Sequence, residues 1–478
     1  MSLAARAAAA LLGLTALPPS ATQCGKGPAE DVVVVSVQEF GARGDGQADD
    51  TVALQRAVDA VPEAGGRLRF APGTFRVAGD RGIRLKDNVR VELGEAVLVA
   101  PNVDGARNRI FEIQGSRNVV ISGGTLVGSR SGSPQWGVGI LASDAEDLLI
   151  ENVTLRDFYF DGILLTGNKG CRRVVVRKVV AENNRRTGLA APMAFDVTIE
   201  QSTFRGSKGQ SPQAGVNFEP NAEGEVRNIR LINNTFSGNA GVGLYIHRGL
   251  GVGVFEATVQ ANVVENNDQG IVASGVDGVT IAGNRVRGHV NRARSGIALG
   301  EGTRRAAVVA NELEGNFRGI IAAGATQVEI RDNRVTGTGL AAAPATGDDG
   351  DGIVCRGLRA VLPDACAITG NTVRRSAGSG IVAQLVSGVQ IRDNTVEESG
   401  QRGVFAAASL NGEVTGNHVA GTGQERPKGF DAIELAQSAN DNLIAHNVVQ
   451  LAPATREAIG IGPGCRGNRV FGNVVVPE

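Results

Sequence analysis

The stretch ANVVENNDQGIVASGVDGVTIAGNRVRG, residues 261–288, contains the pattern that decides the fold. It holds short runs of about four to five residues in which apolar and polar side chains alternate, and Gly or Asn bounds each run. Alternation with a period of two is typical of β-strands, and Gly and Asn favour the turns between them. Strands this short cannot bury their apolar face alone, so equivalent strands from successive repeats are expected to stack.

Two signals repeat along the chain, and helical periodicity is absent after about residue 62. A glycine followed by an aliphatic residue recurs every 23–33 residues from Gly139 to Gly403, and alanine takes its place at Ala432 and Ala458. Out of phase with it runs an asparagine followed by alternating apolar residues, as in GNTVRR. Stacked strands form parallel sheets in which neighbouring strands lie about 4.8 Å apart, so inward Asn side chains of successive coils can hydrogen-bond to one another. The pattern predicts an all-β, right-handed parallel β-helix of about 13 coils. A β-propeller is disfavoured because longer blades and aromatic repeats are missing.

The N-terminus reads as a secretory signal peptide, residues 1–23. Arg6 precedes an apolar run that is too short to span a bilayer, and Pro and small residues follow it. We therefore expect a secreted, periplasmic or cell-surface protein, with Cys24 a candidate lipid anchor. No other segment approaches the length of a membrane span. The remainder, 31–478, is expected to form a single β-helix domain, with an N-terminal cap segment at 31–77 and stacked coils over 110–478.

The segment DDTVALQRAVDAV, residues 49–61, predicts a short amphipathic helix. Asp49 or Asp50 is the expected N-cap residue. A stacked rod exposes an apolar end, so the helix is expected to cap it.

The stretch VQEFGARGDGQADDTVALQRAVDAVPEAGGRLRFAPGTFRV, residues 37–77, resembles the opening of pectate-lyase-superfamily proteins. The resemblance covers about 40 residues and carries the Asp-Asp-Thr and Pro-Gly-Thr-Phe elements. It implies a right-handed parallel β-helix that acts on polysaccharides as a lyase, hydrolase or epimerase, or that serves as an adhesin. The aspartates of this motif are architectural in that family.

Chemistry-bearing side chains gather on two neighbouring coils. When every coil is aligned on its Gly, the first and third following positions face inward and the second and fourth face outward. Most outward positions hold small or inert residues, but one coil carries Asn217 and Glu219 and the next carries Tyr245 and His247. Equivalent residues on adjacent coils lie about 5 Å apart, so Glu219 is expected beside His247 and Asn217 beside Tyr245.

These residue types suit the breaking of a uronate chain by β-elimination, which needs a base, an acid and a group that stabilises carboxylate charge. His247 and Tyr245 are the candidate base and acid, and Glu219 is expected to orient the imidazole. The predicted reaction is cleavage of an acidic polysaccharide. The predicted catalytic residues are His247, Tyr245 and Glu219, and the predicted substrate contacts are Asn217, Arg248, Asp161 and Tyr159.

Three alternatives remain open. A hydrolase would pair Glu219 with Asp161 or Asp196. A C5-epimerase would return the proton from the opposite face, and Phe-Glu-Pro-Asn is similar to the Asp-Pro-His element of mannuronan C5-epimerases, with Asn221 in place of its His. A non-catalytic polysaccharide-binding or adhesion β-helix is the third.

Charge and cysteine content bound the other partners. The formal net charge is −1, and Arg residues are interleaved with Asp and Glu, which argues against nucleic acid. The acidic loop GDDGDG (347–352) is a candidate Ca²⁺ site or a simple turn, and no other metal site is predicted. Cys355 and Cys366 flank a short loop and could close a disulfide, whereas Cys171 and Cys465 are far apart in sequence and are expected to be buried free thiols at least as readily as a second pair. Glu434 and Asp431 are expected to be solvated surface or a secondary carbohydrate contact. The oligomeric state is left open.

Overall fold

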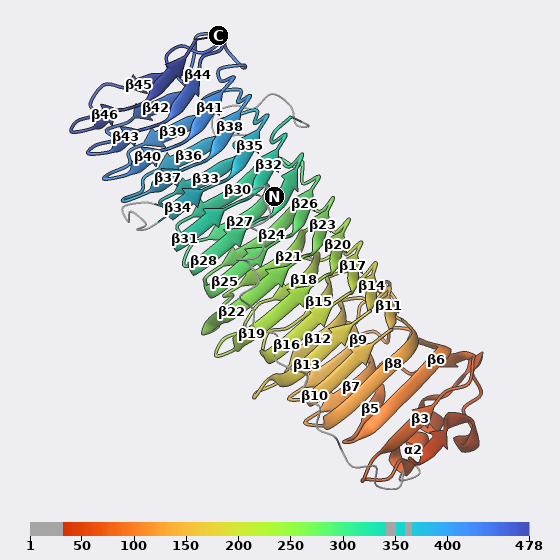
Figure 1. The fold of residues 1–478 in the computed structure, drawn as a ribbon. Helices are drawn as coiled ribbons and strands as arrows, with labels where there is room; N and C mark the ends of the chain where they lie inside the picture. The colour runs from red at the N-terminus through yellow and green to blue at the C-terminus, as the bar shows by residue number, and fades with distance from the viewer. Residues whose placement is uncertain (1–31, 341–349, 359–365, 478) are drawn as a thin grey trace, which may run out of the picture.

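The chain winds into an elongated right-handed solenoid of parallel strands (Figure 1). The computed structural model describes residues 32–340, 350–358 and 366–477. The predicted signal peptide and Cys24 lie outside these residues, so export and lipidation stay predictions. No helix in the described part of the chain has the length and apolar character needed to cross a bilayer.

Each central coil contributes three short strands. In one coil these are β12 (Asp161–Thr166), β13 (Cys171–Arg177) and β14 (Val180–Glu182), and the next coil begins with β15 (Thr187–Ala190). The first strand of every coil joins a 15-stranded sheet, and the other two join the 32-stranded sheet. Every pairing is parallel, and β12 pairs with β15 of the following coil. The predicted fold class is therefore confirmed.

The rod has 15 coils in its first sheet, whereas the glycine pattern predicts about 13. The two additional coils contain β5 (Ile83–Leu85) and β7 (Arg107–Gln114), which precede β9 (Trp136–Ser143). In the strand register, Ile110 of β7 occupies the place that Gly139 takes in β9. The repeat glycine is replaced by a bulky residue in the coil of β7, whereas the coil of β5 keeps it as Gly82 before Ile83. The regular spacing is therefore interrupted at Ile110 and resumes only at Gly139.

The predicted alternation of inward and outward residues is present along the coils. Ile163 and Leu165 of β12 are fully buried, as are Val216 and Phe218 two coils later. One core cluster runs from Val35 to Val449 along the inside of the solenoid. Side chains therefore fill the coil interior, and only the outward positions are available for binding.

A ladder of buried asparagines ties the coils together, as predicted from the repeating Asn. The backbone N–H and the Nδ2 of Asn262 both donate to Oδ1 of Asn284, at 2.9 Å each. The same Nδ2 also donates to the carbonyl oxygen of Leu231 on the preceding coil. Each side chain thus satisfies polar groups on both neighbours. The ladder comprises Asn234, Asn262, Asn284, Asn311, Asn333, Asn371, Asn394, Asn417, Asn447 and Asn473.

Helix α2 (Thr51–Ala60) lies at the N-terminal end of the rod, beside β1 (Val34–Ser36) and β5 (Figure 1). Its buried residues include Leu54 and Val58. Asp50 occupies the N-cap position but makes no capping bond with its side chain. Its carboxylate accepts hydrogen bonds from the backbone of Arg43 and Gly44 in the preceding loop. The helix is where the sequence predicts it, but Asp50 stabilises the loop.

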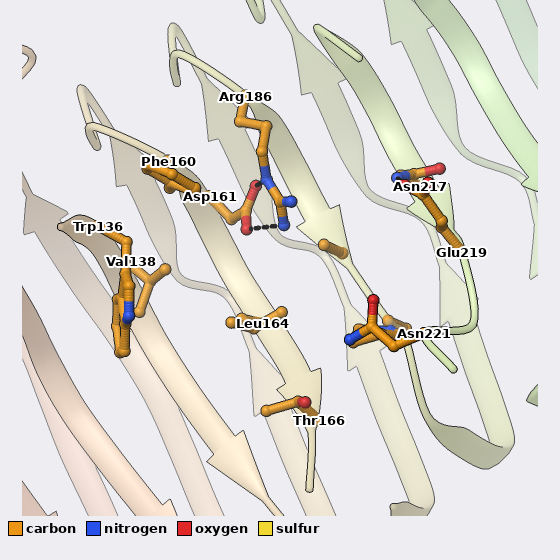
Figure 2. A pocket seen from close by; sticks show the side chains of 13 residues that line it. Trp136, Val138, Phe160, Asp161, Leu164, Thr166, Arg186, Asn217, Glu219 and Asn221 are labelled. Carbon is orange, nitrogen blue, oxygen red and sulfur yellow. Dashed lines mark hydrogen bonds and ion pairs between the residues drawn. The ribbon is translucent and has the colours of Figure 1, made fainter. Parts of the chain in front are cut away.

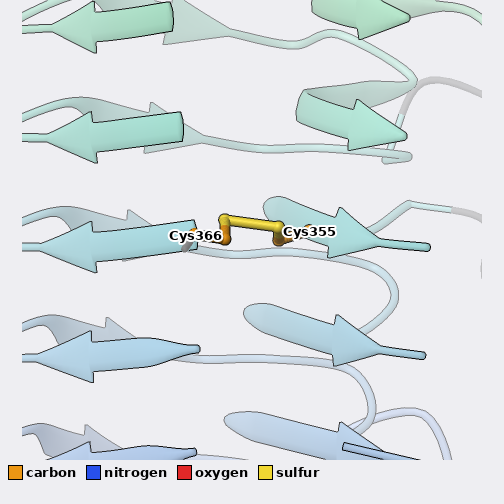
Figure 3. The surroundings of a disulfide bond; sticks show 2 residues. All are labelled: Cys355 and Cys366. Atoms are coloured by element: carbon orange, nitrogen blue, oxygen red, sulfur yellow. A yellow bond between two sulfur atoms is a disulfide. The ribbon is translucent and has the colours of Figure 1, made fainter. Parts of the chain in front are cut away.

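Cys355 and Cys366 form the predicted disulfide, with their Cα atoms 6.8 Å apart (Figure 3). Cys171 is a buried free thiol, as predicted, and burial raises its pKa to about 11. Cys465 is free but partly exposed, because it lies in the last coil. The expectation of a buried thiol at Cys465 is therefore wrong.

Candidate functional site

The predicted cluster assembles on adjacent strands of the 15-stranded sheet. β18 (Ala214–Phe218) pairs in parallel with β21 (Val242–His247), and the register places Asn217 directly beside Tyr245. Glu219 follows β18, and its Oε2 lies 3.6 Å from Nε2 of His247. The same oxygen accepts a 2.9 Å hydrogen bond from Nδ2 of Asn217. The proximity expected from the repeat register is confirmed for both pairs.

The two rings of β21 lie face to face on the outside of the sheet. Tyr245 and His247 are two residues apart, so they project from the same face, and their centroids are 3.9 Å apart. Burial lowers the pKa of His247, although the negative charge of Glu219 opposes this shift. Burial and then Glu219 raise the pKa of Tyr245. Near neutral pH the imidazole is therefore unprotonated and the phenol keeps its proton.

Two buried polar atoms in this cluster make no hydrogen bond to any described residue, namely Oδ1 of Asn217 and Nε2 of His247. The orientation of the Asn217 amide is determined by its neighbour, because a carboxylate only accepts hydrogen bonds and the donor Nδ2 must face it. The acceptor Oδ1 is therefore the atom left over. Unsatisfied buried groups are costly and often mark functional sites.

A cleft adjoins the cluster on its N-terminal side, and Figure 2 shows it between the outward side chains of β9, β12, β15 and β18. We call it the Trp136 cleft. Apolar and aromatic side chains form one part of its wall, and polar groups gather at the other. It is lined by Trp136, Val138, Phe160, Asp161, Leu164, Thr166, Arg186, Ala190, Ala191, Pro192, Asn217, Glu219 and Asn221.

Asp161 is fully buried at this cleft and is held by an ion pair (Figure 2). Nε and Nη2 of Arg186 donate to its two carboxylate oxygens at 2.9 and 2.6 Å. The hydroxyl of Thr187 donates to one of them at 2.6 Å. The carboxylate is therefore occupied, and it orients Arg186 in the wall of the cleft.

Sequence reasoning missed Arg186, Trp136 and Phe160. These side chains precede the repeat glycine or lie at a coil corner, outside the second and fourth positions that follow the glycine. The signal that could have found Arg186 is an arginine two residues before Gly188, one coil after an aspartate that directly precedes Gly162.

Two predicted substrate contacts lie outside the Trp136 cleft. Tyr159 packs beneath the guanidinium of Arg185, whose Cζ is 3.9 Å from the ring centroid. Arg248 follows β21 with an exposed side chain, and its backbone N–H donates to the carbonyl of Ser274. The geometry thus brings together five of the seven predicted residues, Asp161, Asn217, Glu219, Tyr245 and His247.

A second hollow lies on the C-terminal side of the cluster and has Tyr245 in its wall. It is also lined by Gln213, Gln269 and an ion pair in which Nε of Arg294 lies 2.8 Å from Oδ2 of Asp268. The two hollows therefore meet at the Asn217–Tyr245 pair. An extended ligand along the sheet would cross both.

The other acidic candidates lie elsewhere. Asp196 belongs to β16 (Ala194–Glu200) in the 32-stranded sheet, where it accepts a hydrogen bond from Asn228. It therefore lies on a different sheet from Glu219, whereas Asp161 and Glu219 both line the Trp136 cleft, where Arg186 and Thr187 hold the Asp161 carboxylate.

Asp348 and Asp349 lie outside the described residues, whereas Asp351 accepts a hydrogen bond from the backbone of Ser379. Within the described residues, no group of three or more His, Cys, Asp or Glu side chains is placed to hold a metal ion.

The residues Asp431 and Glu434 are not the solvated surface that the sequence suggests. Asp431 is fully buried and paired with Arg456. Glu434, mostly buried, pairs with Arg402 at 3.0 Å. Ion pairs across coils explain the difference, since an arginine of an adjacent coil holds each carboxylate.

Comparison with known proteins matches most of the chain. The family model described as "Right handed beta helix region" matches residues 74–249, 194–357 and 319–476, and that described as "Rhamnogalacturonase A/epimerase, pectate lyase-like" matches 34–108. Mannuronan C5-epimerase AlgE2 of Azotobacter vinelandii is 28% identical over 236 residues, covering 45% of this chain and 22% of that protein. The iota-carrageenase of Alteromonas macleodii is 32% identical over 139 residues, covering 27% and 28%.

A solved structure, the A-module of mannuronan C-5 epimerase AlgE6 of Azotobacter vinelandii, superimposes with a TM-score of 0.55 at 20% identity. That match covers 93% of this chain and 100% of the module, and it supports the fold alone. The chain spans less than half of the length of the curated relatives it matches.

Proposed function

Because the chain belongs to the right-handed parallel β-helix family, with a pectate-lyase-like N-terminal segment, we propose that it acts on a polysaccharide lying along the 15-stranded sheet. We propose further that it cleaves a uronate-containing chain by β-elimination. The observation that carries the proposal is the juxtaposition of Asn217, Glu219, Tyr245 and His247, in which a neutral imidazole and a protonated phenol project side by side. The names of the relatives, which include an epimerase, a carrageenase and an alginate lyase, support a polysaccharide substrate.

His247 acts as the base in this proposal and Tyr245 as the acid. The imidazole of His247 takes the proton from C5 of the uronate, and the electron pair forms the C4–C5 double bond. The bond between C4 and the glycosidic oxygen breaks, and that oxygen takes the phenolic proton of Tyr245. Oε2 of Glu219 lies 3.6 Å from Nε2 of His247, and a carboxylate can only accept a hydrogen bond, so Nε2 carries the proton of the neutral imidazole and Nδ1 is its basic atom. Arg248, exposed directly after His247, is the candidate partner for the uronate carboxylate.

A C5-epimerase is the second candidate, and the similarity to mannuronan C5-epimerases favours it. Epimerisation needs a proton delivered to the opposite face of the sugar. Tyr245 and His247 project from the same face of one strand, which suits elimination on one side of the ring.

The test is an assay of the purified protein on pectate, alginate and glycosaminoglycans, with and without calcium. A lyase produces an ultraviolet-absorbing unsaturated product, a hydrolase produces reducing ends without that absorbance, and an epimerase incorporates deuterium from heavy water without cleavage. We expect His247→Gln to lower turnover by about 10²–10⁴-fold. His418→Gln, in β41 (His418–Ala420) of the 32-stranded sheet, is the matched control. Full activity of the His247 variant would show that the site is misassigned.

A further inference from the structure

The Trp136 cleft has one polar atom that demands a hydrogen-bond donor from a ligand. Asn217 is only 2% exposed, and its Oδ1 accepts no hydrogen bond from any residue that the structure describes. Its Nδ2 is committed to Glu219, so the amide cannot turn to offer a donor instead. A sugar hydroxyl can donate to Oδ1. A carboxylate would place acceptor against acceptor.

The charge of the cleft also favours an uncharged sugar over a uronate. Its lining contains one cation, Arg186, and two carboxylates, Asp161 and Glu219, and its other lining side chains are uncharged. The formal charge of the lining is therefore −1, which disfavours an anionic ring in a partly buried space. Arg186 is already engaged by Asp161 through Nε and Nη2. The cleft is thus poorly suited to a uronate.

Aromatic and apolar residues supply the remaining wall. Trp136 and Phe160 lie on the side of the cleft away from Asn217, and the Asp161–Arg186 ion pair lies beside Phe160 (Figure 2). A ring with an apolar face and hydroxyl edges matches this division, because aromatic surfaces pack against the C–H face of the ring while the edges hydrogen-bond.

We infer that the Trp136 cleft binds an uncharged sugar ring through its hydroxyl groups, and that the substrate is a mixed polysaccharide in which a neutral sugar adjoins the uronate. The second half of this inference rests on the proposed function, which places the uronate at His247. The first half concerns binding alone and does not require turnover.

Trp136 makes the inference directly measurable. It is the only tryptophan in the chain and it lines the cleft, so intrinsic tryptophan fluorescence reports on this one place. The wild-type protein is titrated with neutral trisaccharides (mannotriose, galactotriose and xylotriose) and with trimannuronate and trigalacturonate. We expect at least one neutral trisaccharide to cause a saturable change in the fluorescence of Trp136. The uronate trisaccharides should bind at least about tenfold more weakly than that neutral trisaccharide. Added salt should narrow that gap, because it screens the repulsion.

Two variants separate the contacts. Asn217→Leu removes the acceptor at nearly constant size and should weaken binding of the neutral trisaccharide about tenfold or more. Glu219→Gln removes one negative charge and lets the new amide donate to Oδ1 of Asn217, which frees Nδ2 to face the ligand. This exposed variant should therefore bind uronates more tightly than the wild type does, and it carries the test if Asn217→Leu fails to fold. Gln55→Leu is the control, because Gln55 makes a similar 2.9 Å amide–carboxylate contact with Asp59 on helix α2.

The inference is overturned if no neutral trisaccharide changes the emission of Trp136, if uronates bind as tightly as neutral sugars, or if Asn217→Leu leaves neutral binding unchanged. Selective binding of neutral sugars without turnover of any uronate polymer would support the cleft assignment and reject the lyase. Elimination activity on a pure uronate polymer, together with tight uronate binding at Trp136, would support the lyase and reject the assignment of the cleft to a neutral sugar.

Discussion

At the scale of single residues, the most informative side chain is His247, because its protonation state decides whether it can act as a base. Burial lowers its pKa below the ordinary value of 6.5, and Glu219 acts against this shift. In the wild type we expect kcat/KM to rise with pH through a limb that lies below 6.5, since the base must be unprotonated. Glu219→Gln removes the group that favours the imidazolium, so the limb should move to still lower pH.

The imidazole can also be followed without turnover, by NMR titration of the four histidines, with His247→Gln assigning the signal. A titration midpoint of His247 at or above 6.5, or an upward shift in Glu219→Gln, would contradict the assigned roles.

The predicted cluster and the missed arginine show what a repeat register can find. Asn217, Glu219, Tyr245 and His247 were identifiable because strand pairing carries outward positions from one coil to the next at a fixed spacing. Arg186 sits at a corner, where direction depends on the turn between strands. Asp161 was predicted as a substrate contact, but its carboxylate accepts hydrogen bonds from Arg186 and Thr187. These contacts depend on side-chain packing, which the spacing of residues does not reveal.

At the scale of elements, the asparagine ladder links coils that otherwise share only strand pairing and apolar stacking. Oδ1 of Asn333 accepts two hydrogen bonds from Asn311, and its Nδ2 donates to Asn371 and to the carbonyl of Val308. We expect Asn333→Ala to lower the free energy of unfolding by about 2 kcal/mol or more, because several buried polar groups lose their partner together. Urea denaturation would measure the loss.

The matched control is Asn473→Ala in the last described coil. Asn473 accepts the same pair of bonds from Asn447, but it is partly exposed, so water can replace what is lost. A smaller loss is expected there. Equal losses at both positions would mean that the ladder contributes no more than an exposed hydrogen bond does.

The same element scale explains why the coil of β7 interrupts the glycine pattern and was not counted. The solenoid tolerates Ile110 where most coils have Gly, because β7 pairs with β5 and β9 through its backbone whatever the side chain. A repeat glycine therefore indicates a coil, but a coil can form without one. The fold class depends on the alternation itself, which is why it was predictable when the number of coils was not.

At the scale of the whole molecule, the two ends of the rod differ. Helix α2 packs beside β1 and β5 at the N-terminal end, whereas β45 (Ile459–Ile461), β46 (Arg469–Phe471) and β47 (Val474–Val476) each pair with only one neighbouring strand in the described chain. Phe471 and Val474 are 52% and 55% exposed there. Repeat proteins are stabilised by nearest-neighbour contacts, so a coil with one neighbour opens more readily than a coil with two.

Hydrogen exchange should therefore be fastest, among the strands, in residues 459–476 and should slow over the next few coils toward the centre. Mass spectrometry of peptides from β27 (Ser295–Gly300), which has a paired strand on each side, provides the internal reference. Protection of residues 459–476 that equals that of β27 at low protein concentration would show that this edge is stable by itself. Protection that rises with concentration would show instead that a second copy of the chain covers it, since association removes the exposed edge by mass action.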